Sequence, residues 1–510
     1  MRRVSLVLVL SIVATIACAK RVHRAAVGPE SIGTLDRRAP FVKVHMRDGS
    51  LYVLSPWSAN DDERRVNGRG THYSVARDVL ATGELSVSLD SVVIVETNVV
   101  KPSPTVAGMA VITGITAAVA IGCAINPKAC FGSCPTFYVG DGVSEVLQAE
   151  GFSASIAPSL EARDVDALFR ARPPSGREVR VLMRNEAYET HVVRYANLLV
   201  VPRTSGQRVF ADDAGIFWSV TSPLTPARCK APEGDCTRAL SVFDEHERWS
   251  AADSLDLATR EIVEVSFDAE VESPALVIAS RQSLLPTFLL YQAFAYMGSS
   301  VGRWLAALER ADSTTARRVQ TLAATLGGID VLVPNGRGGW DSVATIKETG
   351  PLAADVRMVR LPATLRRGPV RLRMAKGAWR LDFVGLASVR ERVTPTRVPP
   401  RDVQLADGTR DSVARAKLVD QRTPLIAYPG DRYTLVYELP DEAARFELFL
   451  ESKGYYLEWM RQEWIAEENP LRAAALFLDP AGSLRRLAPE FKRVEPGLEA
   501  AFWRSKYAGY

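Results

Sequence analysis

Two short stretches hold acidic residues and a histidine close enough together to do chemistry. The first contains Glu186, Glu189 and His191, in a segment that joins two strand-like runs. The second is Asp244-Glu-His-Glu247, in an acidic and loop-rich region. Carboxylates and imidazole can hold a hard cation or move a proton, and the first stretch would need a further partner from elsewhere. We interpret the first as a solvated hairpin corner and the second as a solvated helix start.

Motifs of the common catalytic and nucleotide-binding classes are absent from the chain. It has no phosphate-binding GxxxxGK[ST] loop, no GxGxxG after a strand, no HExxH and no GxSxG. The sequence therefore predicts no catalytic residue, no metal ligand and no cofactor. It favours a protein that is not an enzyme, and a hydrolase built from scattered residues stays open as the alternative.

The cysteine spacing predicts disulfide bonds rather than a metal site. Cys229 and Cys236 bracket KAPEGD, in which a proline and a glycine favour a turn, so the two thiols can close a small loop. Cys130 and Cys134 enclose another short loop that could close, and Cys123 is left over. The alternative is a zinc site built from these last three cysteines and a distant histidine. Their spacing lacks the CxxC pairs that zinc knuckles prefer, so we favour disulfides.

The N-terminus has the layout of an export signal. Two arginines open the chain, and the apolar stretch over residues 4–17 is too short to span a bilayer. This stretch ends in Thr15-Ile-Ala-Cys18. An exported location also agrees with the cysteine pairs, because disulfides persist in oxidising compartments.

The end of this signal resembles the lipobox of bacterial lipoproteins, in which a small residue precedes a cysteine that is diacylated and becomes the mature N-terminus. Thr15 departs from the pattern, because Leu, Val or Ile is usual there. The resemblance implies removal of residues 1–17, lipidation of Cys18 and a lipid-anchored protein of the bacterial cell envelope. Ala19 after the cysteine implies the outer membrane, with the protein facing the periplasm. An ordinary secretory signal, with an incidental Cys18, is the alternative.

An uncharged run over residues 106–125 organises the chain. Small residues four apart would line one face of a helix and let another backbone approach closely; these are Ala110, Gly114, Ala118 and Gly122. Most of the run is Ala, Gly or Thr, so it is weakly hydrophobic for a bilayer span. A span would also place Cys229 and Cys236 in a reducing cytosol. We therefore favour a close-packed or membrane-associated helix over a true span.

The composition is that of a globular protein without an electrostatic footprint for nucleic acid. The 510 residues suggest about three domains. The chain is 47% hydrophobic and 24% charged, and its net charge of +4 is spread along it. We expect no nucleic-acid partner. The expected partners are the membrane, through the N-terminal lipid and, as an alternative to burial, through residues 106–125, together with a protein or a glycan.

Alternation of apolar and polar residues predicts a mainly β protein with α segments. Val42–Met46 and Leu51–Leu54 flank Asp48-Gly49, which is a strong hairpin signal. Val370–Met374 alternates as a strand with one buried face should. The pattern predicts a small N-terminal antiparallel β unit, a Gly/Ala-rich helix and β-sandwich-like C-terminal domains with a buried helical insertion.

These patterns divide the chain into successive segments: a signal peptide (1–17), a lipid anchor and tether (18–40), a small β-barrel-like domain (41–104), the Gly/Ala-rich helix (105–126), a β-rich domain with disulfide loops (127–260), a β-sandwich with a helical insertion (261–393), and a region of strands followed by C-terminal helices (394–510).

Three segments have the pattern of helices. Ser159–Phe169 predicts a short helix, and Leu284–Ala307 predicts the buried insertion, with Gly298 ending its first part. Aromatic residues from Tyr455 to Trp464 fall at helical spacing and predict the start of the C-terminal helices.

Three functional hypotheses follow. The first is a non-enzymatic envelope lipoprotein that acts as a scaffold or binding protein. The second is a carbohydrate-binding or carbohydrate-active envelope protein, because RLRMAKGAWRLDFVGLA resembles the late strands of galactose-binding-type jelly rolls. That resemblance makes Trp340 or Trp379 a sugar-stacking candidate, although we interpret both as core residues. The third is a metal-dependent hydrolase that uses the clusters near residues 186–191 and 244–247.

Overall fold

The chain is mainly β with a few helices, as the sequence predicts. The computed structural model describes residues 20–27, 29–39, 41–46, 50–60, 62–73, 79–102, 134–140, 144–156, 160–169, 176–187, 189–298, 301, 304, 324–347, 350–365, 368–427, 430–440, 445–458 and 467–504. They fall into two compact units. The first lies within residues 1–122 with short segments at 293–309 and 460–470, and the second comprises the remainder.

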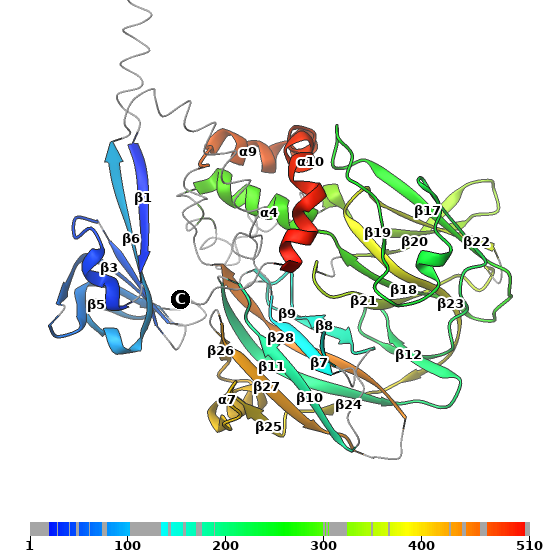
Figure 1. Cartoon of the computed structure of the whole chain (residues 1–510), viewed down its shortest axis with the longest axis horizontal. Helices are drawn as coiled ribbons and strands as arrows, with labels where there is room; N and C mark the ends of the chain where they lie inside the picture. The colour runs from blue at the N-terminus through cyan, green and yellow to red at the C-terminus, as the bar shows by residue number, and fades with distance from the viewer. Residues whose placement is uncertain are drawn as a thin grey trace, which may run out of the picture. The chain divides into compact units, whose positions relative to one another are not determined.

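The first unit is built on one antiparallel sheet, sheet A, drawn in blue in Figure 1. Its strands follow the spatial order β1-β6-β2-β3-β4-β5. Their bounds are β1 Lys20–Val27, β2 Val42–Met46, β3 Leu51–Asn60, β4 Arg65–Tyr73, β5 Val79–Ser88 and β6 Val92–Pro102. The hairpin of β2 and β3 is the one that the sequence predicts. Among the described pairings, β1 and β5 form the two edges, so the predicted barrel-like unit is an open sheet.

Residues 20–27 correct the predicted tether. They form β1, which pairs antiparallel with the whole second half of β6, from Val95 to Pro102. The 3-10 helix η1 (Pro29–Thr34) follows and buries Ile32 among the apolar residues of sheet A. A polar segment without apolar period can still be a strand, because pairing along a partner satisfies its backbone groups whatever its side chains are.

The second unit begins with two sheets that share a hydrophobic core. Sheet B has the order β25-β27-β10-β7-β8, and sheet C has the order β24-β11-β28-β9 with β26 beside β11. The strands of sheet B are β7 Thr136–Gly140, β8 Glu145–Glu150, β10 Glu178–Arg184, β25 Asp402–Gln404 and β27 Arg432–Glu438. Those of sheet C are β9 Ala162–Ala167, β11 Glu189–Pro202, β24 Thr396–Val398, β26 Leu425–Ala427 and β28 Phe446–Glu458.

Sheet topology revises the predicted domain boundaries. β10 pairs with β27, and β11 pairs with β28 along thirteen residues of register. Strands from segments 127–260 and 394–510 therefore complete the same sheets and do not form separate domains. Local patterns cannot reveal such pairings, because each partner lies more than two hundred residues from the other.

Strand β11 is buried on both faces. Leu198 and Val200 contribute to the core between sheets B and C, whereas Leu199 and Val201 contribute to a second core shared with sheet D. A strand that is covered on both sides needs a continuous apolar run, and Leu198–Val201 supplies one. Sheet C is thus the middle layer of the second unit.

Two further sheets complete the second unit. Sheet D has the order β13-β12-β21-β18-β23-β16, and an additional pairing of β13 with β23 closes five of its strands into a ring. Its strands are β12 Gln207–Ala211, β13 Phe217–Thr221, β16 Arg248–Trp249, β18 Pro274–Gln282, β21 Asp355–Arg360 and β23 Trp379–Val393. Sheet E, in the order β15-β14-β17-β22-β19-β20, consists of β14 Arg228–Ala231, β15 Gly234–Asp235, β17 Arg260–Phe267, β19 Ile329–Pro334, β20 Trp340–Ile346 and β22 Gly368–Ala375.

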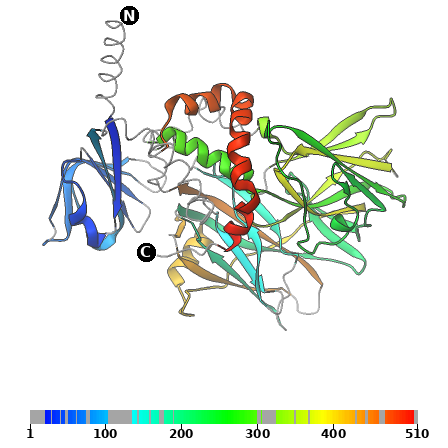
Figure 2. The same cartoon turned by 45° about the horizontal axis from the view of Figure 1, so that its top comes forward.

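The helices begin and end at residues with clear capping roles. Helix α4 (Leu284–Met297) is the predicted apolar insertion, and Gly298 after it has a φ of +50°, a conformation that favours glycine at a helix end. Helices α9 (Pro470–Leu478) and α10 (Pro480–Arg504) meet at Asp479. Its carboxylate accepts a hydrogen bond from the backbone N–H of Gly482 at 2.9 Å, which starts α10 and produces the bend visible in Figure 2. A shorter helix, α7 (Ser412–Asp420), covers the core of sheets B and C.

Two predicted helical segments are strands. Residues of the predicted helix Ser159–Phe169 form β9, and Tyr455 and Tyr456 lie in β28 rather than in a helix. β9 pairs along β28, so each strand supplies the other with backbone partners. Tertiary pairing overrides the helical propensity of Ala, Leu and Glu here.

Candidate functional site

A buried arginine at the end of β18 organises the most elaborate polar site in the second unit. Arg281 is 7% exposed and donates from Nε to Glu247 Oε1 at 2.5 Å and from Nη2 to Glu247 Oε2 at 2.7 Å. Its Nη1 also donates to the backbone carbonyl of Pro351 at 2.7 Å. This bidentate geometry fixes the loop before β16, which carries Glu247, against sheet D.

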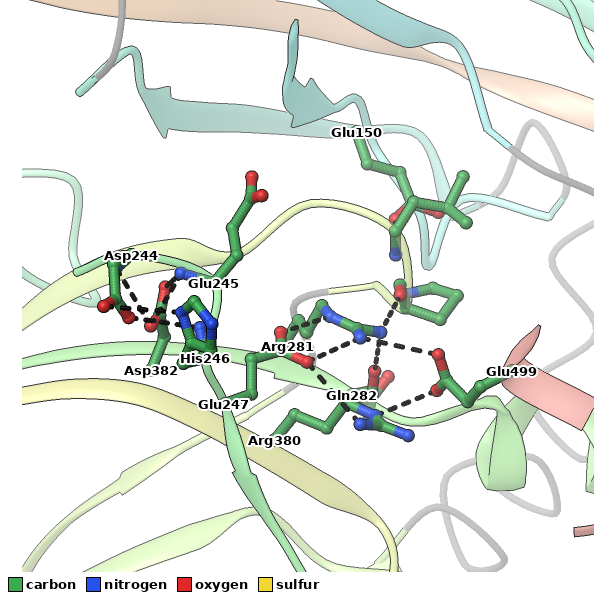
Figure 3. A network of polar contacts seen from close by, with 12 residues as sticks. Glu150, Asp244, Glu245, His246, Glu247, Arg281, Gln282, Arg380, Asp382 and Glu499 are labelled. Atoms are coloured by element: carbon green, nitrogen blue, oxygen red, sulfur yellow. Dashed lines mark hydrogen bonds and ion pairs between the residues drawn. The ribbon is translucent and has the colours of Figure 1, made fainter. Parts of the chain in front are cut away.

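A second arginine and a second glutamate complete an alternating network. Arg380, on β23, donates from Nε to Glu499 Oε1 at 3.0 Å and lies 3.6 Å from Glu247 through its Nη1. Glu499, on α10, also accepts from Arg281 at 3.4 Å. Figure 3 shows the four side chains converging from four segments of the chain. Two guanidinium groups and two carboxylates balance their charges, which is what a buried ionic cluster requires.

The charge balance fixes the protonation state of Arg281. Burial alone would lower its pKa, but the carboxylates of Glu499 and Glu247 outweigh that effect and hold the pKa of Arg281 above its usual value. The arginine is therefore a permanent cation at this site.

Next to this network, Asp382 anchors a strained loop. Its carboxylate accepts hydrogen bonds from the backbone N–H of Asp244 at 3.2 Å and of Glu245 at 3.1 Å. Glu245 has a φ of +69°, a region that residues other than glycine rarely occupy. Figure 3 shows that the Glu245 side chain points away from Asp382. The hydrogen bonds from the two backbone donors thus offset part of the strain in the loop.

The protonation of Asp382 is sensitive to pH near neutrality. It is 1% exposed, and burial raises the pKa of its carboxyl to about 6, although the two backbone donors oppose the rise. The negative charges of Glu247 and Asp244 also raise the pKa of Asp382.

These groups border a cavity of about 300 Å³. Its polar lining consists of Gln148, Glu245, Glu247, Arg281 and Asp382, and its apolar lining of Val146, Leu147, Ala167, Phe243, Leu352, Ala353 and Ala354. The volume lies at the lower end of the range for ligand sites, which is roughly 300–1,000 Å³. Glu150 steadies one wall, because its Oε2 accepts from the backbone N–H of Leu352 at 2.7 Å.

The chemistry of this cavity is that of hydrogen-bond acceptors beside an apolar wall. The lining holds three carboxylates, those of Glu245, Glu247 and Asp382, and one guanidinium, that of Arg281, so carboxylates outnumber cations in it. In the parts of the chain that the structure describes, no group of three or more His, Cys, Asp or Glu side chains is arranged to hold a metal ion.

The predicted helix start from Asp244 to Glu247 is wrong. It is a loop rather than a solvated helix start, and Glu247 is largely buried against Arg281. His246 is exposed and lies 3.4 Å from its neighbour Asp244. The run therefore contributes carboxylates to the cavity wall, whereas its histidine stays outside the lining.

The cluster of Glu186, Glu189 and His191 is also different from the predicted solvated corner. Glu189 and His191 lie at the start of β11 with no exposed surface, and His191 Nε2 is 2.6 Å from Glu189 Oε1. Glu186 instead accepts from the hydroxyls of Tyr138 at 2.7 Å and Thr136 at 3.0 Å. These contacts make the cluster part of the interior of sheets B and C.

The predicted disulfide between Cys229 and Cys236 is confirmed. The two sulfurs are bonded, with 4.9 Å between the Cα atoms, and the bond closes the β14–β15 hairpin. Cys134 is buried, but Cys130 lies outside the described residues, so their pairing stays a prediction.

The predicted membrane-related residues also lie outside the described ranges. These are Cys18 and the helix-packing residues Ala110, Gly114, Ala118 and Gly122. Within the described ranges, none of the helices combines the length and apolar character that crossing a bilayer requires.

The two sugar-stacking candidates lie in different surroundings. Trp379 is 1% exposed, as predicted for a core residue. Trp340 is half-buried, with the guanidinium of Arg371 over its ring at 4.0 Å. Neither tryptophan lines the cavity.

Arg281, Arg380, Asp382 and Glu499 are not among the residues predicted from the sequence. One signal was available for Arg281, because it follows seven apolar or small residues in the strand PALVIASRQ. A charge at the end of a fully buried strand needs a buried counter-charge. Comparison of this chain with models of known protein families and with curated protein sequences gives no match.

Proposed function

We propose that the protein is an exported, lipid-anchored binding protein of the bacterial cell envelope, and that it binds a small ligand in the cavity beside Arg281. The cavity is the observation that carries the proposal, because it combines carboxylate and amide side chains with an apolar wall. The lipobox-like end at Cys18 and the disulfide of Cys229 and Cys236 support an exported location.

Binding fits the arrangement better than catalysis. The ionic groups at the cavity form a charge-balanced frame in which Glu247 is bound by Arg281 and approached by Arg380. A catalytic group has to change its partner or its proton during a reaction, whereas this frame holds each charge in place. A scaffold role without a ligand leaves the cavity unexplained.

The ligand that fits is small and carries hydrogen-bond donors. Glu245 and Asp382 supply acceptors, and Phe243 and Leu352 supply an apolar surface. Hydroxyl or ammonium groups on a compact apolar frame match this lining. A sugar unit is such a molecule, which agrees with the second of the three hypotheses.

Glucose and glucosamine are the probes that test this assignment. They differ at one position, which carries a hydroxyl group in glucose and an ammonium group in glucosamine. Isothermal titration of the full chain should show binding of at least one of them, weakened about tenfold or more in Glu245→Gln, which removes a charge from the lining. Glu272→Gln, at an exposed residue that does not line the cavity, is the matched control and should bind as the wild type does. If neither probe binds at millimolar concentration, or if Glu245→Gln binds unchanged, the cavity is not a site for this ligand class.

A further inference from the structure

A second group of acids lies at the junction between sheets C and D. Asp164 and Asp166 are two residues apart on β9, at the edge of sheet C. Asp355 and Arg357 are two residues apart on β21 of sheet D, and the two strands lie against each other. We name Asp164, Asp166 and Asp355, with Arg357, the carboxylate cluster.

The carboxylate cluster contains one arginine for three carboxylates. Arg357 Nε lies 2.5 Å from Asp355 Oδ2, and its Nη2 lies 3.6 Å from Asp164 Oδ1. The other oxygen of Asp164 accepts from the backbone N–H of Phe152 at 3.0 Å. If every carboxyl were ionised, the cluster would carry two more negative than positive charges in a buried place.

The groups around the cluster increase the imbalance. The negative charge of Glu150 on β8 raises the pKa of Asp166. The negative charge of Asp213, in the turn between β12 and β13, raises the pKa of Arg357. Strand β28 places Leu450 and Ser452, both uncharged, opposite Asp166 and Asp164. Neither of these two positions of β28 therefore supplies a second cation.

Two buried oxygens of the cluster have no hydrogen-bond partner in the part of the chain that the structure describes. Asp166 is 5% and Asp355 is 4% exposed. Among the described residues, neither Oδ2 of Asp166 nor Oδ1 of Asp355 has a donor or acceptor within reach. An ionised oxygen in such a place is costly, whereas a protonated carboxyl is neutral. A metal ion is the other way to neutralise the charge, but no described acidic group is arranged to hold one.

We propose that the carboxylate cluster is a pH-dependent latch: Asp166 and Asp355 each hold a proton while β9 lies against β21, and the loss of these protons to solvent weakens the junction of sheets C and D. Burial raises the pKa of Asp166 well above its usual range, and Asp164 and Asp355 add to the rise. Burial also raises the pKa of Asp355 to about 6, against the opposing effect of Arg357.

Because both pKa values are raised in the folded chain, the stability that these two protons provide should fall as the pH rises. Both folded-state pKa values lie above that of an unfolded aspartate, about 3.9, so the folded chain binds protons that the unfolded chain has released. The stabilisation is complete below about pH 4 and is lost as the pH rises through about 6 for Asp355, and higher for Asp166. Other carboxylates produce the opposite trend, so the test compares variants rather than the profile of the wild type alone.

Urea unfolding of the full chain between pH 4 and pH 8 tests the latch. The ratio of unfolding constants, wild type over Asp355→Asn, should rise by about 50-fold from pH 4 to pH 7, because one linked proton gives up to tenfold per pH unit between the unfolded pKa of about 3.9 and the folded pKa of about 6. Asp166→Asn should give a rise that continues to higher pH. Asp420→Asn, which alters an exposed ion pair with Arg422, is the control, and its ratio should stay flat.

A flat ratio for both Asp355→Asn and Asp166→Asn would overturn the proposal. If these variants fail to fold, hydrogen exchange of the wild type tests the latch instead. Above pH 6, the amides of β9 and β21 should lose protection relative to those of β17. Equal protection of the three strands would refute the latch. A rise in melting temperature with added CaCl2 or MgCl2, lost in Asp166→Asn, would refute it in favour of a cation site. These measurements need no ligand, so they stand or fall independently of the proposed binding function.

Discussion

The guanidinium of Arg281 and the carboxylate of Glu247 face each other in two parallel hydrogen bonds of 2.5 and 2.7 Å. Both side chains are largely buried, and the pair joins the end of β18 to the loop before β16. The loop carries Glu245 into the cavity lining, so this ion pair determines where one wall of the cavity lies.

Replacing the arginine should destabilise the fold. Arg281→Met would leave Glu247 and Glu499 in a buried place with less positive charge, which costs about 3–5 kcal/mol. Urea unfolding at pH 7 measures the loss in free energy of unfolding. Arg422→Met removes an exposed partner of Asp420 and should cost less than about 1 kcal/mol. Equal losses in the two variants would contradict the structural role of Arg281.

The charge of Asp382 should make ligand binding depend on pH. Its pKa is about 6, so the carboxyl is mostly neutral at pH 5 and mostly ionised at pH 7. The amine of glucosamine resembles an α-amino group, whose pKa is about 8, and stays charged in this range. Titration should therefore show tighter binding at pH 7 than at pH 5, and Asp382→Asn should remove most of that difference. The same pH dependence in the variant would exclude Asp382 as its source.

Reduction of the disulfide should lower the stability of the second unit. Cys229 and Cys236 are seven residues apart, and closing a loop of this size stabilises a fold by about 2–3 kcal/mol in the chain-entropy account. Unfolding in dithiothreitol should shift to lower urea by a corresponding amount. The double variant Cys229→Ser/Cys236→Ser should resemble the reduced wild type and should not respond to the reductant.

Lipidation at Cys18 is tested by acyl labelling in a bacterial host. Labelled palmitate should appear in the wild-type chain and be absent from Cys18→Ser, because the acyl group of a lipoprotein is attached through this cysteine. Cys229→Ser should keep the label. Persistent labelling of Cys18→Ser would refute the anchor at this residue.

Elements whose signal is local could be predicted from the sequence. The hairpin of β2 and β3 follows from its alternation and its Asp-Gly turn, and α4 follows from an apolar run that ends at Gly298. The disulfide loop follows from the spacing of Cys229 and Cys236. In each case the residues that decide the structure are neighbours in the chain.

Elements that depend on distant partners could not be predicted. β9 has the composition of a helix, but it pairs with β28, nearly three hundred residues away. Likewise, Glu247, Arg281 and Glu499 have no local pattern that marks them as one network. Their burial arises from the packing of a loop, a strand and a helix, which no single stretch of sequence encodes.

The long separation of β11 and β28 has a consequence during synthesis. When the ribosome has made Leu198–Val201, the strand that covers its backbone groups, Phe446–Glu458, does not yet exist. This apolar run would be exposed to water throughout the synthesis of more than two hundred further residues. A chain that terminates before residue 446 would leave this run uncovered, and it should aggregate rather than fold.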